Sequence, residues 1–317
     1  MQTKKRVENL KQKIFFTTGC LLLSLSLLLS LSFASAGIVE WYNSMTGKVA
    51  SDTASLAVTV GNHAPTIYNV TISNSSQNPS EGGTRYIVVT FNATDTDGVA
   101  NLNDTTAELR FQKATETTRL NTSCVLVGDF NDTSAGYSCR VGLEYWDGSG
   151  EWTINATIDD INEASGENAT ETFTYNLLTS MVMSPTALTW GSLDIIATDT
   201  GSNNDPIEIN NTGNDEALSI NVTGYDLAGS ITTTEYIYAH NFTVEATAGC
   251  GSTTVMSNAT SINITSTILQ SGNNSIAAGD ETSGQEQLYF CLKGMPTTIS
   301  AQDYASGANA WNVQIIT

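Results

Sequence analysis

The sequence predicts an all-β protein, in which two antiparallel β-sandwich domains in tandem follow an N-terminal hydrophobic leader helix. Short apolar runs with a period-2 alternation recur along the chain, and turn-forming clusters such as Ser80–Gly83 and Asp147–Gly150 separate them. Helical periodicity is scarce after the leader. About 280 residues follow the leader, a length that exceeds a comfortable single sandwich and suits two domains.

Residues 1–36 have the three-part layout of a secretory signal peptide. Five basic residues precede an uncharged run from Ile14 to Phe33, and Ala34-Ser35-Ala36 follows as a small-residue cleavage site. The run is also long enough to span a bilayer, so an uncleaved membrane anchor is the alternative. In both cases we expect the rest of the chain to lie outside the membrane.

Residues 37–63 form a lead-in to the first domain. Leu56, Val58 and Val60 alternate with other residues, so Thr53–Val60 is predicted to be a strand that has no evident local partner. This strand would pair with its own first domain, which is the simpler arrangement. Alternatively, it would fill an open sheet edge in a neighbouring molecule and generate filaments.

The first sandwich is expected over residues 64–180 and the second over residues 181–317. The strands predicted in the first are Ile67–Ser73, Tyr86–Thr94, Thr106–Phe111, Cys124–Val127, Tyr137–Trp146, Trp152–Ile158 and Thr172–Leu177. The strands predicted in the second are Leu188–Ile196, Pro206–Ile209, Leu218–Tyr225, Phe242–Ala246, Ile262–Leu269, Gln287–Leu292 and Trp311–Ile316. Met181–Pro185 is the expected boundary.

Four cysteines follow the leader in two well-separated pairs. We expect disulfides between Cys124 and Cys139 and between Cys250 and Cys291, because pairing within each half needs no crossing between domains. A zinc site is the alternative, but the sequence has no C-x-x-C pair and no histidine close to a cysteine. Disulfides indicate export to an oxidising compartment.

N-glycosylation sequons are the most frequent motif of the chain. The fourteen candidates are Asn69, Asn74, Asn92, Asn103, Asn121, Asn131, Asn155, Asn168, Asn210, Asn221, Asn241, Asn258, Asn263 and Asn273. In six apolar runs the sequon keeps register with the alternation, as where Trp152 and Ile154 fall on one face and Asn155 on the other. Asn is a poor strand residue, so this placement favours a sheet protein with sugar on its outer surface. Chance matches from abundant Asn and Thr are the alternative.

Two segments carry a resemblance to a known family. Pro65–Thr71, followed by Thr94–Leu102, resembles the opening of immunoglobulin-like or cadherin-like domains in archaeal cell-surface proteins. Glu151–Asp160 resembles a later strand and loop of the same domains. The resemblance covers about a third of the chain; it implies immunoglobulin-like sandwiches at an archaeal cell surface and supplies no catalytic residue.

Charge and composition argue against several classes of function. The part after the leader has seven basic and 31 acidic residues, a net charge of −24, which repels nucleic acid and anionic lipid headgroups. Only two histidines occur, and there is no phosphate-binding glycine loop and no H-E-x-x-H motif. We therefore expect no enzyme. A pair of carboxylates could still serve a secreted carbohydrate-active hydrolase, which is one alternative.

Calcium is the expected ligand if any cofactor is bound, although none is required. Asp95 and Asp97 form one cluster of hard oxygen ligands, and Asp159 and Asp160 form a second. In an immunoglobulin-like domain the two loops would lie at one end of the sandwich, beside the lead-in. The alternative is that Asp-Thr-Asp-Gly is an ordinary turn sequence, in which these side chains bind no ion.

Together these features predict an exported, N-glycosylated structural component of the cell surface, either in an envelope layer or in an extracellular filament. It would act through self-association, with other copies or other envelope proteins as partners. It would not bind nucleic acid, and only an uncleaved leader would attach it to a membrane. A cell-surface adhesion or ligand-binding module is the main alternative.

Overall fold

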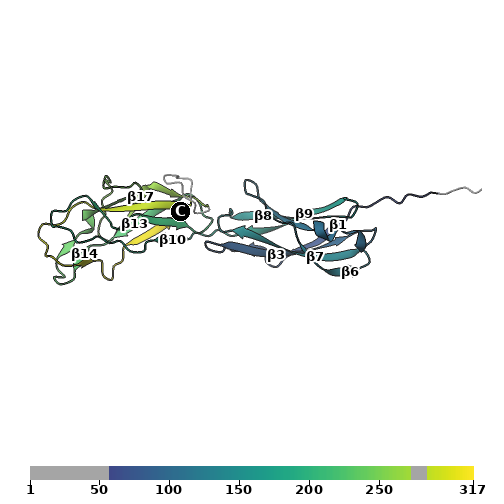
Figure 1. Cartoon of the computed structure of the whole chain (residues 1–317), viewed down its shortest axis with the longest axis horizontal. Helices are drawn as coiled ribbons and strands as arrows, with labels where there is room; N and C mark the ends of the chain where they lie inside the picture. The colour runs from purple at the N-terminus through teal and green to yellow at the C-terminus, as the bar shows by residue number, and fades with distance from the viewer. Residues whose placement is uncertain (1–56, 273–283) are drawn as a thin grey trace, which may run out of the picture. The chain divides into compact units, whose positions relative to one another are not determined.

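The computed structural model describes residues 57–272 and 284–317 (Figure 1). The leader, the lead-in up to Leu56 and the sequon at Asn273 lie outside the described residues. Ala57 to Val60 carry no strand and are exposed. Within the described ranges, no helix has the length and hydrophobicity needed to span a bilayer. The fold is all-β and consists of several mainly antiparallel sheets, as the sequence predicts.

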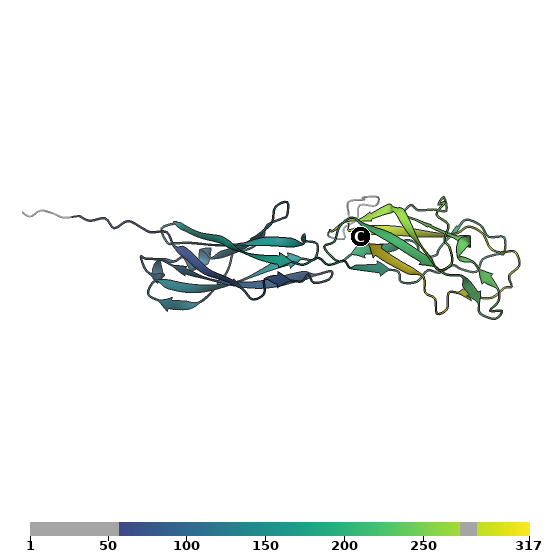
Figure 2. The same cartoon turned by 180° about the vertical axis from the view of Figure 1, so that it is seen from behind.

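The first sandwich consists of two facing sheets, one with the strand order β1-β3-β7-β6 and the other with the order β2-β9-β8-β4-β5 (Figures 1 and 2). The strands are β1 (Thr66–Ile72), β2 (Ser76–Gln77), β3 (Thr84–Thr94), β4 (Glu108–Gln112), β5 (Arg119–Asn121), β6 (Val125–Asn131), β7 (Ser134–Glu144), β8 (Gly150–Asp159) and β9 (Ser165–Tyr175). When β5 and the two-residue β2 are set aside, the remaining seven strands have the ABED and CFG order of an immunoglobulin sandwich.

Alternating side chains fill the space between these two sheets. Trp152, Ile154, Ala156 and Ile158 on β8 are all fully buried, which confirms the face that the sequence alternation assigns to them. From the opposite sheet, the ring of Phe91 stacks on Tyr137 with 5.2 Å between ring centroids. The inward faces of both sheets thus meet in a single core, as expected for aligned sheets of this kind.

All seven strands predicted in this part of the chain are present, most with ends shifted by a few residues, while the strand predicted from Thr172 begins seven residues earlier, at Ser165. The strand predicted from Thr106 begins at Glu108, because Asp104–Thr106 form a 3-10 turn. In this turn the side chain of Asn103 accepts a hydrogen bond from the backbone N–H of Thr105. The short strands β2 and β5 were not predicted, since two or three residues are too few to show an alternation.

The second sandwich is built from smaller sheets. Their strand orders are β10-β12-β18-β11, with β16 also paired to β18, then β17-β13-β20 and β15-β14-β19. The strands are β10 (Met181–Ser184), β11 (Thr200–Gly201), β12 (Ile207–Asn211), β13 (Leu218–Gly224), β14 (Leu227–Gly229), β15 (Tyr236–Ile237), β16 (Phe242–Glu245), β17 (Thr260–Leu269), β18 (Gln285–Leu292), β19 (Tyr304–Ala305) and β20 (Asn312–Ile316). Six of the seven strands predicted here are present.

The prediction of a strand over Leu188–Ile196 is wrong, because this segment is a loop. Leu188, Trp190 and Leu193 nevertheless pack on the second core, whereas Ile195 and Ile196 are exposed. The indole N–H of Trp190 donates to the carbonyl oxygen of Thr200 at 3.0 Å, and its ring lies 5.1 Å from that of Phe242. The alternation therefore records side chains that anchor a loop rather than a strand.

Both predicted disulfides are present. Cys124 and Cys139 join the start of β6 to β7, and Cys250 and Cys291 join a loop to β18. Cys139 and Cys291 are buried in the two sandwiches. These bonds fit an oxidising compartment.

Candidate functional site

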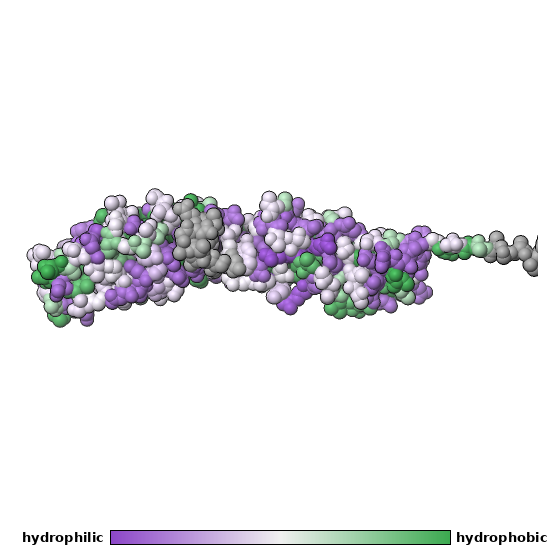
Figure 3. Space-filling view, turned by 45° about the horizontal axis from the view of Figure 1, so that its top comes forward, coloured by the Kyte–Doolittle hydropathy of each residue, from purple (hydrophilic) through white to green (hydrophobic). Residues whose placement is uncertain are grey.

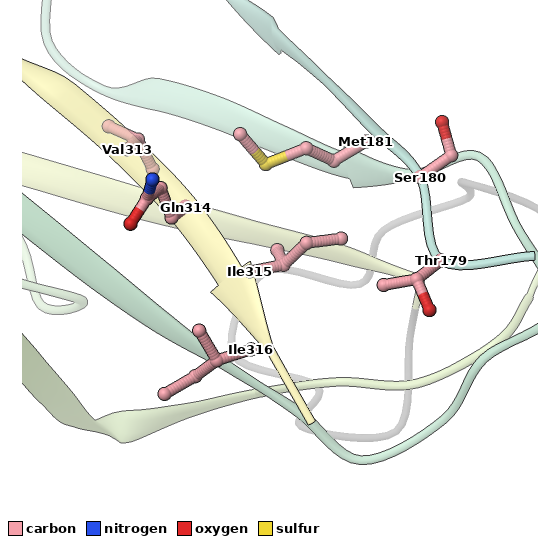
Figure 4. Close-up of a pocket in the computed structure, with 7 residues that line it drawn as sticks. All are labelled: Thr179, Ser180, Met181, Val313, Gln314, Ile315 and Ile316. Carbon is pink, nitrogen blue, oxygen red and sulfur yellow. The ribbon is translucent and has the colours of Figure 1, made fainter.

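An open groove of about 430 Å³ lies between strands β10 and β20 of the second sandwich (Figure 4). Its lining consists of Thr179, Ser180, Met181, Val313, Gln314, Ile315 and Ile316. Among the residues that the structure describes, no charged side chain lines it. Figure 4 shows the side chains of Met181 and Ile315 in the space between the two strands.

The two strands that border the groove are both sheet edges. β10 pairs with β12, where Met181 lies opposite Asn211, and β20 pairs with β13, where Gln314 lies opposite Asn221. In the part of the chain that the structure describes, neither strand has a second strand partner. An edge strand presents unpaired backbone N–H and C=O groups, which are a template for another strand.

Apolar side chains of the groove belong to the second core. Val313 is 8% exposed, whereas Met181 and Ile315 are only partly buried although they pack on that core. Ile316 is 39% exposed. The groove therefore leaves one side of a hydrophobic core accessible, next to backbone groups that can form hydrogen bonds. Such a surface is suited to binding an extended segment of polypeptide.

The predicted calcium-binding loops form a second candidate site, at one end of the first sandwich. The side-chain N–H of Asn62 donates to Asp160 at 2.6 Å, and that of Asn101 donates to Asp95 at 3.2 Å. Asn162 donates to the side-chain oxygen of Asn62 at 2.7 Å. Asp95 and Asp160 are both 1% exposed. The two loops and the start of the domain therefore meet at this end, as expected.

Burial alone would raise the pKa of Asp160. Three hydrogen bonds to its carboxylate, from Asn62, the backbone N–H of Ala164 and the backbone N–H of Asn162, instead hold that pKa below its ordinary value. Asp160 is therefore a buried carboxylate that is stabilised in its charged form.

The backbone N–H of Asp97 donates to the carboxylate of Asp95 at 2.8 Å, but the side chains of Asp97 and Asp159 have other partners. Asp97 accepts a hydrogen bond from the backbone N–H of His63 at 2.7 Å, and Asp159 accepts one from the hydroxyl of Ser165. Among the described residues, no group of three or more His, Cys, Asp or Glu side chains is placed to hold a metal ion. A calcium ion here would need amide oxygens in addition to Asp95 and Asp160. Calcium binding stays a prediction.

The sequon asparagines differ in their exposure. Exposed ones are Asn69, Asn74, Asn131, Asn258 and Asn263, and half-buried ones are Asn92, Asn103, Asn121, Asn168, Asn210, Asn221 and Asn241. The face shown in Figure 3 is largely hydrophilic to neutral, with hydrophobic areas scattered between. Twelve of the thirteen sequon asparagines within the described ranges are thus exposed or half-buried, and their glycosylation stays a prediction.

Asn155 departs from this pattern. It lies on the outward face of β8, as the alternation predicts, but its side chain is only 6% exposed. Its side-chain N–H donates to Glu167 at 2.7 Å, and Arg110 lies opposite it in the neighbouring strand β4. Since β8 lies between β4 and β9, longer side chains on both neighbours surround this asparagine. The expectation that Asn155 is an exposed surface position is wrong.

Sequence comparison does not place the chain in a family. No protein-family model matches the sequence, and no curated protein matches it significantly. Functional inference therefore depends on the geometry described above.

Proposed function

We propose that this chain is an exported, N-glycosylated structural component of the cell surface, an envelope-layer or extracellular filament subunit that acts through self-association. The observation that carries the proposal is the uncharged groove between two open sheet edges in the second sandwich. A protein of net charge −20 that leaves such a surface uncovered has a site for another polypeptide.

Two further observations support a location outside the cell. Both cysteine pairs form disulfides, which persist in oxidising compartments. Of the thirteen sequon asparagines within the described ranges, Asn155 is the one that is buried, so the others present at least part of their side chain to solvent. No sequon asparagine within the described ranges lines the groove, and Asn210 and Asn221 lie on the neighbouring strands β12 and β13, opposite Val182 and Gln314.

Self-association is tested with protein purified from its native source. Sedimentation velocity across a wide concentration range should show particles that grow with concentration. A monomer at every concentration would remove the proposal. Intact mass should exceed that of the unmodified mature chain, and a mass equal to it would contradict glycosylation.

A ligand-binding or adhesion module is the second candidate, and one observation favours it. Tyr236 lies on β15, Tyr238 caps the 3-10 turn Ala239–Asn241 that follows, and His240 lies within this turn. The ring of Tyr238 stacks on those of Tyr236 and His240, with 6.1 Å and 5.2 Å between ring centroids. Tyr238 is 42% exposed. Exposed aromatic rings can stack on sugar rings, so this candidate predicts a monomer that binds a glycan and loses affinity with Tyr238→Ala.

A further inference from the structure

We propose that the groove between β10 and β20 receives residues 53–60, the lead-in strand of a second copy of this chain. The inference rests on the proposed function, because it names the contact through which self-association occurs. The added strand would join one or both sheet edges and cover the exposed side of the second core.

The acceptor has the two features that strand addition requires. β10 and β20 each offer one unpaired backbone edge within the described residues, so an incoming strand can form main-chain hydrogen bonds. Met181, Val313 and Ile315 supply apolar surface between these edges. Alternate side chains of the incoming strand would therefore be buried, while the others would face solvent.

The donor segment matches these features. Leu56, Val58 and Val60 alternate in Thr53–Val60, and the whole segment is uncharged. Val58 is 77% exposed and Val60 is 81% exposed. Because this segment is uncharged, it would bring no carboxylate into a groove whose described lining is also uncharged. The rest of the protein carries a net negative charge and would repel other copies of the protein.

The lengths also agree. Eight residues of extended chain span about 27 Å at roughly 3.4 Å per residue. β20 has five residues and β10 has four. The lead-in strand is therefore long enough to follow either edge over its full length.

The groove of the same chain is out of reach of this segment. Asn62 is held at the end of the first sandwich where Asp160 lies, whereas the chain leaves that sandwich at Tyr175, which pairs with Gly150. The ten residues of β8 separate these two ends, a distance of roughly 30 Å. The extended segment 53–60 is about as long as this distance, so it would end before it reached Thr179. A second copy must supply the strand, and such head-to-tail contacts repeat into an open filament unless they close into a ring.

Another exposed edge, β6, fits the donor less well. Val125, Val127 and Phe130 are exposed along it, but its pairing with β7 has two register shifts. Irregular pairing hinders strand addition, so the regular edges of the groove are the better acceptor.

The test uses two substitutions in the full mature chain, each with a matched control. Val58→Asp places a charge on the face of the donor that would be buried, and Thr59→Asp places the same charge on the other face. Ile315→Asp charges the groove, and Asn312→Asp charges the same strand outside the groove lining. We expect Val58→Asp and Ile315→Asp to abolish polymers in sedimentation, and both controls to polymerise like wild type.

Mixing the two inactive variants identifies the direction of the contact. Val58→Asp retains its groove, and Ile315→Asp retains its donor strand. An equimolar mixture should therefore form heterodimers and nothing larger, because only one of the two possible contacts is intact. Polymers from Val58→Asp alone would overturn the donor assignment and leave self-association standing. If wild-type protein stays monomeric, the result would instead contradict the proposed function itself.

A peptide experiment covers the case in which Ile315→Asp does not fold, as judged by circular dichroism. A peptide of residues 53–60 in excess should shorten wild-type polymers, and the same peptide with Val58→Asp should not. Equal polymer lengths with both peptides would overturn the inference.

Discussion

The two sandwiches differ in how completely each covers its core. In the described residues, the first core has 22 buried side chains and two that are partly buried at its margin. The second core has 16 buried side chains and twelve partly buried ones. These twelve are Met181, Met183, Leu188, Trp190, Leu193, Leu227, Ile262, Met295, Ile299, Tyr304, Trp311 and Ile315. The first sandwich is therefore closed by its own strands, whereas the second leaves part of its core accessible.

Strand length accounts for much of this difference. β3, β7 and β9 each have eleven residues, and the register between β3 and β7 is unbroken along their whole length. Among the described residues of the second sandwich, six strands have four residues or fewer. Long paired strands bury a continuous face, while short ones leave loops to cover the core. The closed sandwich is suited to a structural role and the open one to making contacts.

The largest expected effect tests the closed core. Trp152→Ala removes a fully buried ring from the centre of the first sandwich and should lower the free energy of unfolding by about 3–5 kcal/mol. Urea denaturation of wild type and variant measures this loss. The matched control is Trp190→Ala in the second sandwich, where the partly buried ring should cost less. An equal loss in both would contradict the contrast between the two cores.

The disulfides provide the next comparison. Cys250 and Cys291 are 41 residues apart in the sequence, and Cys124 and Cys139 are 15 apart. On the chain-entropy account, closing the longer loop stabilises by about 4 kcal/mol and the shorter by about 3 kcal/mol. Replacing both cysteines of a pair by serine should therefore destabilise more in the second sandwich. Unfolding midpoints in the reverse order would show that the loop-length argument does not govern this protein.

The first sandwich could be predicted from sequence almost completely. An alternation such as that of Trp152 to Ile158 identifies the strand and its buried face, and the cysteine spacing identifies the bridges. The strand prediction that is wrong in the second sandwich has a physical cause. Leu188 and Trp190 alternate as in a strand but anchor a loop, because alternation reports burial and not pairing.

The groove could not be found in the same way. The sequence predicts the strand at Trp311–Ile316, but it indicates a domain boundary at Met181–Pro185, where the structure has β10. Which edges remain unpaired depends on the strand order, and a single sequence does not reveal that order. The buried state of Asn155 has a similar cause, since it depends on side chains from neighbouring strands.

Met181→Ala should separate monomer stability from assembly. Its side chain is only partly buried, so truncation should lower monomer stability by less than the roughly 2–5 kcal/mol expected for a fully buried methionine. Polymer formation should be affected more strongly, because the added strand would bury this side chain. Urea denaturation and sedimentation of the same sample compare the two effects. A variant that is destabilised but polymerises normally would show that Met181 serves only the core.

Calcium is tested at the end of the first sandwich. If the predicted site forms, calcium should raise the unfolding midpoint of wild type and should have a smaller effect on Asp160→Asn. Asp215→Asn, a substitution of the same kind in the second sandwich, is the control for charge. Equal unfolding midpoints of wild type with and without calcium would contradict the predicted calcium site.

The smallest expected effect is the pH dependence that Asp160 confers on the closed sandwich. Hydrogen bonds from Asn62, Asn162 and Ala164 keep its folded-state pKa below the unfolded value, which is near 4. The folded state therefore binds fewer protons than the unfolded state, so Asp160 contributes stability above that pH. This contribution is lost as the pH falls through the folded-state pKa. Asp160→Asn cannot titrate, so its urea midpoint should fall less steeply than that of wild type on acidification below about pH 4. Parallel pH profiles for the two proteins would show that the hydrogen bonds from Asn62, Asn162 and Ala164 do not stabilise the charged form of Asp160.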